Sequence, residues 1–461
     1  MEVTSQTKAK ITNFIAMVAV LFPPVWFGGK GLFAFLSGDD FMNLYGYWSK
    51  PFIATLQANF FYFSSFYRPL GGLAYLGFYS AFGLNPLPFR LACFAIFFFN
   101  LFLLYKLALT LTGSKETALL TTLFGSHHGG YFDYYFNTGT IYDLLCYTFF
   151  SLGLYLYITK SKVLYVVLCF ICALNAKEMG VTFPAVVLAY ELIFHWPGFG
   201  IQKMKSWFIE RGFIPLLLVL LLVPYVISKL SAASIFFGNQ EYKLDLSVAQ
   251  YLANSIRYLD LMLYYNQGWA TIPILLGFML GMVCIALAFQ SRILIFSTFF
   301  ALITPLPILF IHSRGSIFVL YIPMIGFTLY LAALLVLLRD KFFSNVPWRR
   351  PITFSIVYAL FFWWHAKNVP FFSEVIGIRQ TVNQLSALNL NPKVGARILL
   401  LDDPFEKEEW TPLFIGRLLY HDQELIVDRI KMMDKKPTVE EIKSYDFVLN
   451  YQTGQLRLVG K

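Results

Sequence analysis

Long apolar runs alternate with short polar segments up to about residue 367. Because a bilayer core takes roughly 20 apolar residues as a helix, a run of about that length is a candidate membrane span. The candidates are residues 11–36, 88–112, 117–136, 140–158, 163–176, 179–195, 212–231, 270–289, 293–311, 317–338 and 351–366. This pattern predicts an all-α polytopic membrane protein with about 11 transmembrane helices.

Two segments between these runs are long. Residues 37–87 are rich in Phe and Tyr, and residues 232–268 also carry several tyrosines. Both are typical of amphipathic helices that lie on a membrane surface. Within the first segment, Leu70–Leu84 is apolar enough that a further pair of spans is the alternative.

The pattern changes after residue 367. Ala396–Leu401 predicts a strand, and Glu409–Tyr420 predicts a helix. Phe447–Tyr451 and Gln455–Val459 flank Thr453-Gly454 and predict a hairpin. We therefore expect two domains, a transmembrane module over residues 1–367 and a small soluble α+β domain over residues 368–461.

Composition and charge support this division. The chain is 58% hydrophobic and 13% charged, whereas soluble domains are about 25% charged. This composition excludes a soluble enzyme, a disordered chain or a disulfide scaffold for most of the sequence. Residues 371–461 hold 13 of the 26 acidic residues. The basic excess lies in short loops, which is typical of a protein embedded in membrane lipids. A nucleic-acid-binding protein would need a contiguous basic face.

The basic loops also predict an orientation. The loops on the same side of the membrane as the N-terminus are short and hold Lys and Arg at a higher density than the loops on the other side. Basic loops favour the cytoplasmic side, so we expect the N-terminus to be inside the cell. An odd number of spans then places residues 368–461 outside. We expect a multi-pass protein of a bacterial inner membrane with a periplasmic site, or otherwise of the endoplasmic reticulum with a lumenal site.

Ionisable residues collect at the predicted outer ends of the spans. Such residues are costly in or near a membrane and are usually functional. They come from separate parts of the chain and include Asp39, Asp40, His127, His128, Asp133, Asp143, Lys177, Glu178, His312 and Arg314. Any chemistry is therefore expected on the outer face.

The adjacent carboxylates of Asp39 and Asp40 have two interpretations. Like charges raise the pKa of one carboxyl group, which suits a general base that takes a proton from a hydroxyl. Alternatively, one residue caps a helix and the other is solvated. The sequence leaves both readings open.

Histidines and an acid interrupt the apolar pattern near the third run. His127, His128 and Asp133 are residue types that bind zinc. Adjacent histidines point apart in a regular helix or strand, however, which favours hydrogen bonds to a sugar or a phosphate. The pair Cys169 and Cys172 lies in an apolar run, so two small buried residues are favoured over a redox or zinc site.

Basic side chains supply candidates for binding an anion. Lys177 and Glu178 either neutralise each other, or Lys177 holds an anionic group that Glu178 orients. Arg314 lies in a very short outer loop. Its planar guanidinium suits a phosphate, although a single Arg at that depth is otherwise an interface anchor.

Together these motifs resemble the GT-C superfamily of membrane glycosyltransferases. The similarity is strongest to the protein O-mannosyltransferases and the transmembrane mannosyltransferases with tetratricopeptide tails. It rests on Asp39-Asp40, Arg68-Pro69-Leu70 with Phe82-Gly83, Asp143-Leu144-Leu145, Ala176-Lys177-Glu178 with Pro184, and Arg314 through Phe327. Thr140 stands where that family usually has Arg, and the α+β tail replaces the tetratricopeptides.

The resemblance implies a specific reaction. Such enzymes transfer a sugar, with inversion, from a polyprenyl-phosphate donor to an acceptor at the outer or lumenal face. It implies that Asp39 or Asp40 is the base and that Arg314 and Lys177 bind the donor phosphate. Glu178, His127, His128, Asp133, Asp143 and Arg68 would line the sugar or acceptor pocket. The acceptor is a protein, a lipid or a glycan, and no cofactor is expected, although a divalent metal is possible.

Two other classes of protein are alternatives. A transporter or flippase for lipid-linked sugars is expected to place polar residues near the bilayer midplane, in paired halves. A non-catalytic subunit of polysaccharide assembly would need no acidic pair facing a basic pair. The crowding of polar residues at one surface disfavours the transporter.

Overall fold

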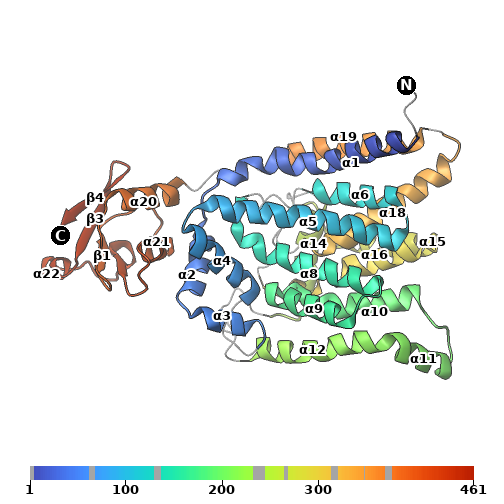
Figure 1. Ribbon diagram of the computed structural model, residues 1–461, viewed down its shortest axis with the longest axis horizontal. Helices are drawn as coiled ribbons and strands as arrows, with labels where there is room; N and C mark the ends of the chain where they lie inside the picture. Colours follow the sequence, from blue (N-terminus) through green and yellow to red (C-terminus); the bar gives the residue numbers. More distant parts are fainter. Residues whose placement is uncertain are drawn as a thin grey trace.

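A computed structural model describes residues 5–61, 68–128, 136–231, 244–263, 268–312, 320–346, 348–368 and 376–460. Helices make up the described part of the transmembrane module, and the sheet lies in the C-terminal domain. The domain lies at one end of an elongated helix bundle (Figure 1). The candidate site residues Asp133 and Arg314 lie outside the described residues.

Each of the 11 apolar runs contains a helix, and most of these helices lie along the long axis of the molecule (Figure 1). They are α1 (Ser5–Gly28), α5 (Pro86–Thr112), α6 (Lys115–Ser126), α8 (Ile141–Ile158), α9 (Val163–Ala176), α10 (Phe183–Phe194), α12 (Phe213–Leu230), α15 (Ile272–Ala288), α16 (Arg292–Ile303), α18 (Pro323–Phe342) and α19 (Arg349–Asn368).

Shorter helices connect these elements. They are the 3-10 helices η1 (Gly29–Phe33), η3 (Thr138–Thr140) and η4 (Glu178–Thr182), the π-helix η5 (Phe208–Gly212), and the α-helices α2 (Gly38–Trp48), α3 (Phe52–Ala58), α4 (Pro69–Phe82), α11 (Ile201–Trp207), α14 (Val248–Met262) and α17 (Leu306–Leu309).

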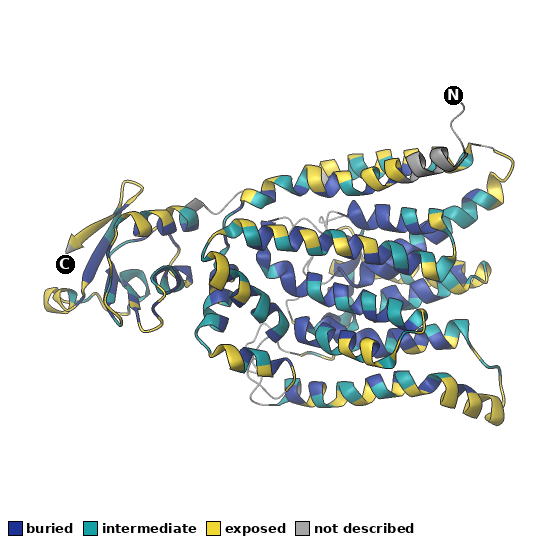
Figure 2. Cartoon of the chain, viewed as in Figure 1, coloured by how far each residue is buried: buried dark blue, intermediate teal, exposed yellow. Residues whose placement is uncertain are grey.

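Six helical segments among the described residues are long and apolar enough to cross a membrane: Phe14–Phe33, Pro86–Thr112, Thr138–Ile158, Ile201–Lys229, Arg292–Leu309 and Pro323–Phe342. Two further apolar helices, α9 and α15, are shorter. Exposed residues remain on the outer helices α1 and α12 (Figure 2), and many of them are apolar. A helical membrane protein is therefore supported, whereas the predicted 11 crossings are not confirmed.

The predicted surface segments also contain helices. Residues 37–87 hold α2, α3 and α4, which lie at the end of the bundle near the C-terminal domain (Figure 1). Because α4 has 14 residues, it is short for a crossing, which weakens the alternative of a hidden span pair. In residues 232–268 the described helix is α14.

Close backbone contact and buried polar groups hold the bundle together. The Asn100 side chain of α5 donates to the Leu144 carbonyl of α8 over 3.0 Å and accepts from Thr148 over 2.6 Å. Gly326 of α18 lies against α16. A Cβ atom there would be 2.7 Å from the Ala301 nitrogen and 2.8 Å from the Ser297 oxygen.

The C-terminal domain contains a four-stranded sheet in the order β2-β1-β3-β4. β1 (Arg397–Leu400) pairs in parallel with β2 (Ile426–Arg429) and β3 (Phe447–Gln452), and β4 (Gln455–Gly460) is antiparallel to β3. Its helices are α20 (Ile376–Ala387), α21 (Thr411–Leu419) and α22 (Val439–Lys443). The predicted strand, helix and hairpin are confirmed, but the parallel pairing and β2 were not predicted.

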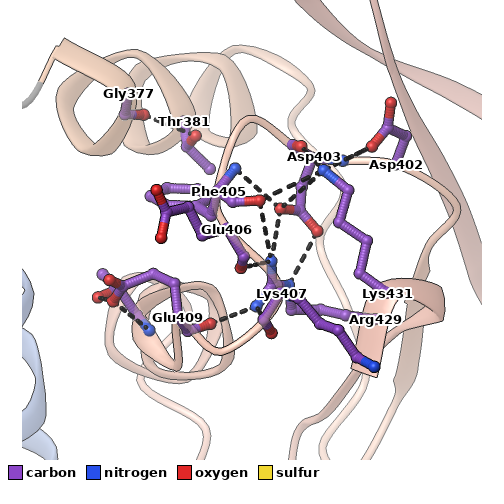
Figure 3. A network of polar contacts seen from close by, with 11 residues as sticks. Gly377, Thr381, Asp402, Asp403, Phe405, Glu406, Lys407, Glu409, Arg429 and Lys431 are labelled. Atoms are coloured by element: carbon purple, nitrogen blue, oxygen red, sulfur yellow. Dashed lines mark hydrogen bonds and ion pairs between the residues drawn. The ribbon is translucent and has the colours of Figure 1, made fainter. Parts of the chain in front are cut away.

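A buried ion pair organises the loop after β1 (Figure 3). The Arg429 guanidinium is fully buried and donates to both carboxylate oxygens of Asp403, over 2.8 and 2.7 Å. It also donates to the carbonyls of Glu406 and Glu409. Because a buried charge is costly unless it is paired and hydrogen-bonded, these bonds restrict residues 402–409 to one arrangement.

We expect Gly326→Ala to destabilise the bundle by about 1–3 kcal/mol, because the added methyl group meets backbone atoms that cannot rotate away. The matched control is Gly277→Ala on α15, where a Cβ atom would meet nothing within 4 Å. Thermal unfolding of the purified protein in lipid nanodiscs measures both. Equal melting temperatures for the two variants would contradict the close packing of α16 and α18.

Candidate functional site

Asp40 is a buried structural carboxylate. It forms a capping box with Ser37 at the start of α2, accepting the Ser37 N–H over 2.8 Å. Its other oxygen accepts the Tyr75 hydroxyl over 2.7 Å, and the Arg90 guanidinium lies 3.8 Å away. Burial and these three partners give Asp40 the capping role that the sequence left open.

Asp39 differs from its neighbour in exposure. It lies in the first turn of α2 and is exposed. Of the two candidate bases, Asp39 is the one that a substrate from solution reaches.

Arg68 and Glu178 form a bidentate ion pair across the bundle. The Arg68 Nε and Nη2 atoms donate to the two Glu178 oxygens over 3.1 and 2.6 Å. The side chains are 14% and 18% exposed. Arg68 has a left-handed backbone, with φ of 51°. This conformation is uncommon for a residue other than glycine, and such strain persists only where the surroundings fix it.

A second ion pair involves Lys177, the residue before Glu178. The Lys177 ammonium donates to Asp143, and both side chains are buried. Asp143 belongs to the first turn of α8, and Lys177 follows the end of α9. The Lys229 ammonium at the end of α12 also interacts electrostatically with Glu178 and Arg68. These five residues carry three positive and two negative charges.

Three tyrosines connect this charged cluster with Asp40. The Tyr142 hydroxyl donates to that of Tyr47 over 3.2 Å, and Tyr47 donates to the Arg68 carbonyl over 3.3 Å. The Arg68 guanidinium lies 5.3 Å from the centre of the Tyr142 ring. The rings of Tyr75 and Tyr142 are 6.0 Å apart. Because Gly71 and Gly72 of α4 lack side chains, the Tyr142 and Tyr47 rings lie directly against that helix.

Local charges decide which of these groups ionise. Burial alone raises the pKa of Glu178, but the nearby Arg68 and Lys177 charges outweigh burial and lower that pKa to about 2. Burial raises the pKa of Tyr47 to about 12. Burial, followed by the charge of Asp40, raises the pKa of Tyr75 well above its usual range. At neutral pH, Glu178 is therefore charged and these tyrosines are hydrogen-bond donors.

His127 and His128 are buried and contact different helices. The His127 Nδ1 atom lies 2.9 Å from the Leu123 carbonyl, and His365 of α19 lies 2.6 Å from the His127 carbonyl. The His128 Nε2 atom lies 2.9 Å from the Met262 carbonyl of α14. In the described parts of the chain, no group of three or more His, Cys, Asp or Glu residues is suited to a metal ion.

The structure adds residues that the sequence analysis missed. Arg90 lies within an apolar run, and its charge there is the signal that could have identified it. It is buried and donates to the Phe35 carbonyl over 2.7 Å. Tyr47, Tyr75 and Tyr142 gave no comparable signal, because tyrosine is abundant throughout the chain.

No protein-family model matches this chain, and a search of curated proteins finds no match. The arrangement of the site therefore carries the functional argument.

We expect Asp40→Ala to destabilise the protein by about 3–5 kcal/mol, because it leaves the buried Arg90 charge without its carboxylate. Asp39→Ala removes an exposed side chain in the first turn of α2 and is expected to cost no more than about 1 kcal/mol. Thermal unfolding measures both variants. A larger loss for Asp39→Ala than for Asp40→Ala would contradict the assigned roles.

The Glu178 carboxylate gives a pH dependence of stability. Its pKa in the folded protein lies below its ordinary value of 4.5. Its contribution is therefore complete above about pH 4.5 and is lost as the pH falls toward about 2. We expect the melting-temperature difference between wild type and Glu178→Gln to shrink over that range. Glu440→Gln, at an exposed position of α22, is the control. A difference that grows on acidification would refute the Arg68–Glu178 pair.

Proposed function

We propose that this protein is an inverting glycosyltransferase of the GT-C type. It would move a hexosyl group from a polyprenyl-phosphate donor to an acceptor hydroxyl. The observation that carries the proposal is the placement of the exposed Asp39 carboxylate on α2, the helix whose Tyr47 contacts the charged cluster. That cluster has an excess of positive charge and comes from segments far apart in the sequence.

Glycosyl transfer needs a base and cations on opposite sides of the sugar. In the proposed reaction, Asp39 takes the proton of the acceptor hydroxyl as its oxygen bonds to the anomeric carbon. The bond from that carbon to the phosphate oxygen breaks, and the phosphate leaves with the electron pair. Attack opposite the leaving group inverts the anomeric centre.

Lys177, Lys229 and Arg68 support the proposed leaving-group side of the site. Arg68 and Lys177 are each held by a carboxylate, Glu178 and Asp143, so their positions are set before a substrate binds. Fixed cations stabilise developing charge without reorganising. The resemblance adds Arg314 to this set, and adds Asp133 to the sugar or acceptor pocket.

A cavity of about 330 Å³ supports a lipid-linked donor. Its wall is apolar apart from His128 and Thr328, and the Thr328 hydroxyl donates to the Met324 carbonyl over 2.7 Å. We propose that part of the polyprenyl chain occupies it. The lining residues come from α6, α14, α18 and α19 and include Phe124, Met262, Met324, Phe327, Phe361 and Trp364.

The proposal also includes the membrane face and the acceptor, which rest on the charges of the loops and on the resemblance. The active site lies at the outer face, which is periplasmic in a bacterial inner membrane or lumenal in the endoplasmic reticulum. The acceptor is a protein, a lipid or a glycan, and no nucleic acid takes part. We propose no cofactor.

The test is sugar transfer and donor hydrolysis by purified protein in lipid, from a panel of radiolabelled polyprenyl-phosphate sugars. We expect turnover of one donor and a loss of at least about 100-fold in Asp39→Asn, because a general base contributes about 10²–10⁴ in rate. Lys177→Met is expected to weaken donor binding.

The control for this experiment is Glu440→Gln, which removes one carboxylate from an exposed position of α22. It is expected to keep wild-type activity. Folding of each variant is verified by its melting temperature. Retention of wild-type turnover in Asp39→Asn, or no turnover and no binding of any donor by wild type, would exclude the proposal.

A further inference from the structure

The C-terminal domain contacts α2 at the residue before Asp39. A Cβ atom placed on Gly38 would lie 2.6 Å from the Thr411 hydroxyl oxygen and 3.3 Å from a Glu409 carboxylate oxygen. Gly38 therefore permits α21 and the loop before it to approach the first turn of α2. That turn also carries Asp39.

Several contacts beyond Gly38 fix this docking. The Arg417 guanidinium of α21 donates to the Tyr45 hydroxyl of α2 over 2.7 Å. The Tyr45 and Phe414 rings stack with their centres 5.1 Å apart. The Tyr79 hydroxyl of α4 donates to the Leu418 carbonyl over 2.6 Å. Polar and aromatic contacts from two helices of the module thus meet the same face of α21.

The loop that ends at Glu409 is held from inside its own domain. Figure 3 shows Arg429 between the Asp403 carboxylate and the backbone of the loop. The Arg429 Nη2 atom donates to the Glu406 carbonyl over 2.8 Å, and Nη1 donates to the Glu409 carbonyl. A residue fully buried in its domain therefore sets where the backbone of Glu409 lies.

Glu409 has a carboxylate oxygen available at this junction. Its Oε1 atom accepts from the Thr411 N–H over 3.1 Å and from the Thr411 hydroxyl. Its Oε2 atom has no hydrogen-bond partner among the described residues, and the residue is exposed. Glu409 thus presents an acceptor of hydrogen bonds next to the turn that carries Asp39.

We propose that the C-terminal domain stays docked on α2 during turnover and forms one wall of the Asp39 site. Glu409 is the residue of that wall that binds the acceptor. A carboxylate accepts hydrogen bonds from hydroxyl groups and repels anions, so the structure assigns an uncharged, polyhydroxylated acceptor such as a neutral sugar. The inference rests on the proposed function for the acceptor, but its docking component does not.

A disulfide tests the docking without any turnover. The Cβ position of Gly38 lies 3.9 Å from the Thr411 Cβ atom, within the range of about 3.5–4.5 Å that disulfides adopt. The double variant Gly38→Cys/Thr411→Cys of the full chain is expected to cross-link on mild oxidation in lipid nanodiscs. Mass spectrometry of the linked tryptic peptides measures the yield. The control pair is Gly38→Cys/Lys443→Cys, because α22 lies at the far end of the domain (Figure 1).

Activity of the cross-linked protein tests whether the wall is fixed. We expect it to keep at least about half of the donor turnover of its reduced form. A cross-link yield no higher than that of the control pair would overturn the docking. Loss of turnover on oxidation that returns on reduction would overturn the fixed wall, because the domain would then have to leave α2. If wild type turns over no donor, the proposed function fails while the cross-link yield still tests the docking.

Glu409→Gln tests the acceptor side, with Glu408→Gln as a matched control on the same exposed loop. The probes are methyl α-mannoside as a neutral acceptor and methyl glucuronide as an anionic one, with water as the competing acceptor. Wild type is expected to prefer the neutral probe. Glu409→Gln is expected to raise KM for that probe about tenfold, as for the loss of a hydrogen bond to a charged group, whereas Glu408→Gln is expected to keep the wild-type KM. Identical behaviour of the two variants, or a preference of wild type for the anionic probe, would overturn the role of Glu409.

Discussion

The buried Asp40 carboxylate is the interaction on which the end of the bundle depends. Its bonds to Ser37 and Tyr75 and its contact with Arg90 join the start of α2 to α4 and α5. Arg90 in turn holds the carbonyl of Phe35 that precedes α2. Since a buried charge needs its partners in place, the direction of α2 is fixed. That direction leaves Asp39 at the surface.

The same requirement assembles the charged cluster. Each ion pair joins residues from different parts of the chain, because a charge withdrawn from water needs an opposite charge in contact with it. Arg68 and Glu178 are 110 residues apart, and Asp143 and Lys177 are 34 apart. The tyrosines between α2, α4 and α8 occupy the space that separates the two ion pairs from Asp40. The cations of the cluster are therefore held in place by ion pairs and by packing.

Much of the fold was predictable from the apolar runs of the sequence. The predicted run 163–176 coincides with α9, and residues 140–158 with α8 to within one residue. The predicted run 117–136 is less exact, because α6 ends at Ser126, where His127 and His128 interrupt the apolar pattern. The parallel pairing of β1 with β3 depends on contacts 49 residues apart in register, which local patterns do not specify.

The candidate site was predictable in its residue types and not in its pairings. The charges of Lys177 and Glu178 stood out against an apolar background, whereas Arg68 was found only through the resemblance to a family. Which acid is buried depends on Tyr75 and Arg90, which lie 35 and 50 residues beyond Asp40. The sequence alone therefore left Asp39 and Asp40 equivalent, and tertiary contacts separate them.

The docking of α21 on α2 also has a consequence for biosynthesis. Tyr45 and Arg417 are 372 residues apart. At a translation rate of about 5–20 residues per second, α2 emerges about 20–75 seconds before the helix that covers it. The apolar helices are by then available for insertion, whereas the wall beside Asp39 is the last part of this arrangement to be made. An incomplete chain would hold the acid and the cations but would lack that wall, so the proposed acceptor site matures only when synthesis has passed α21.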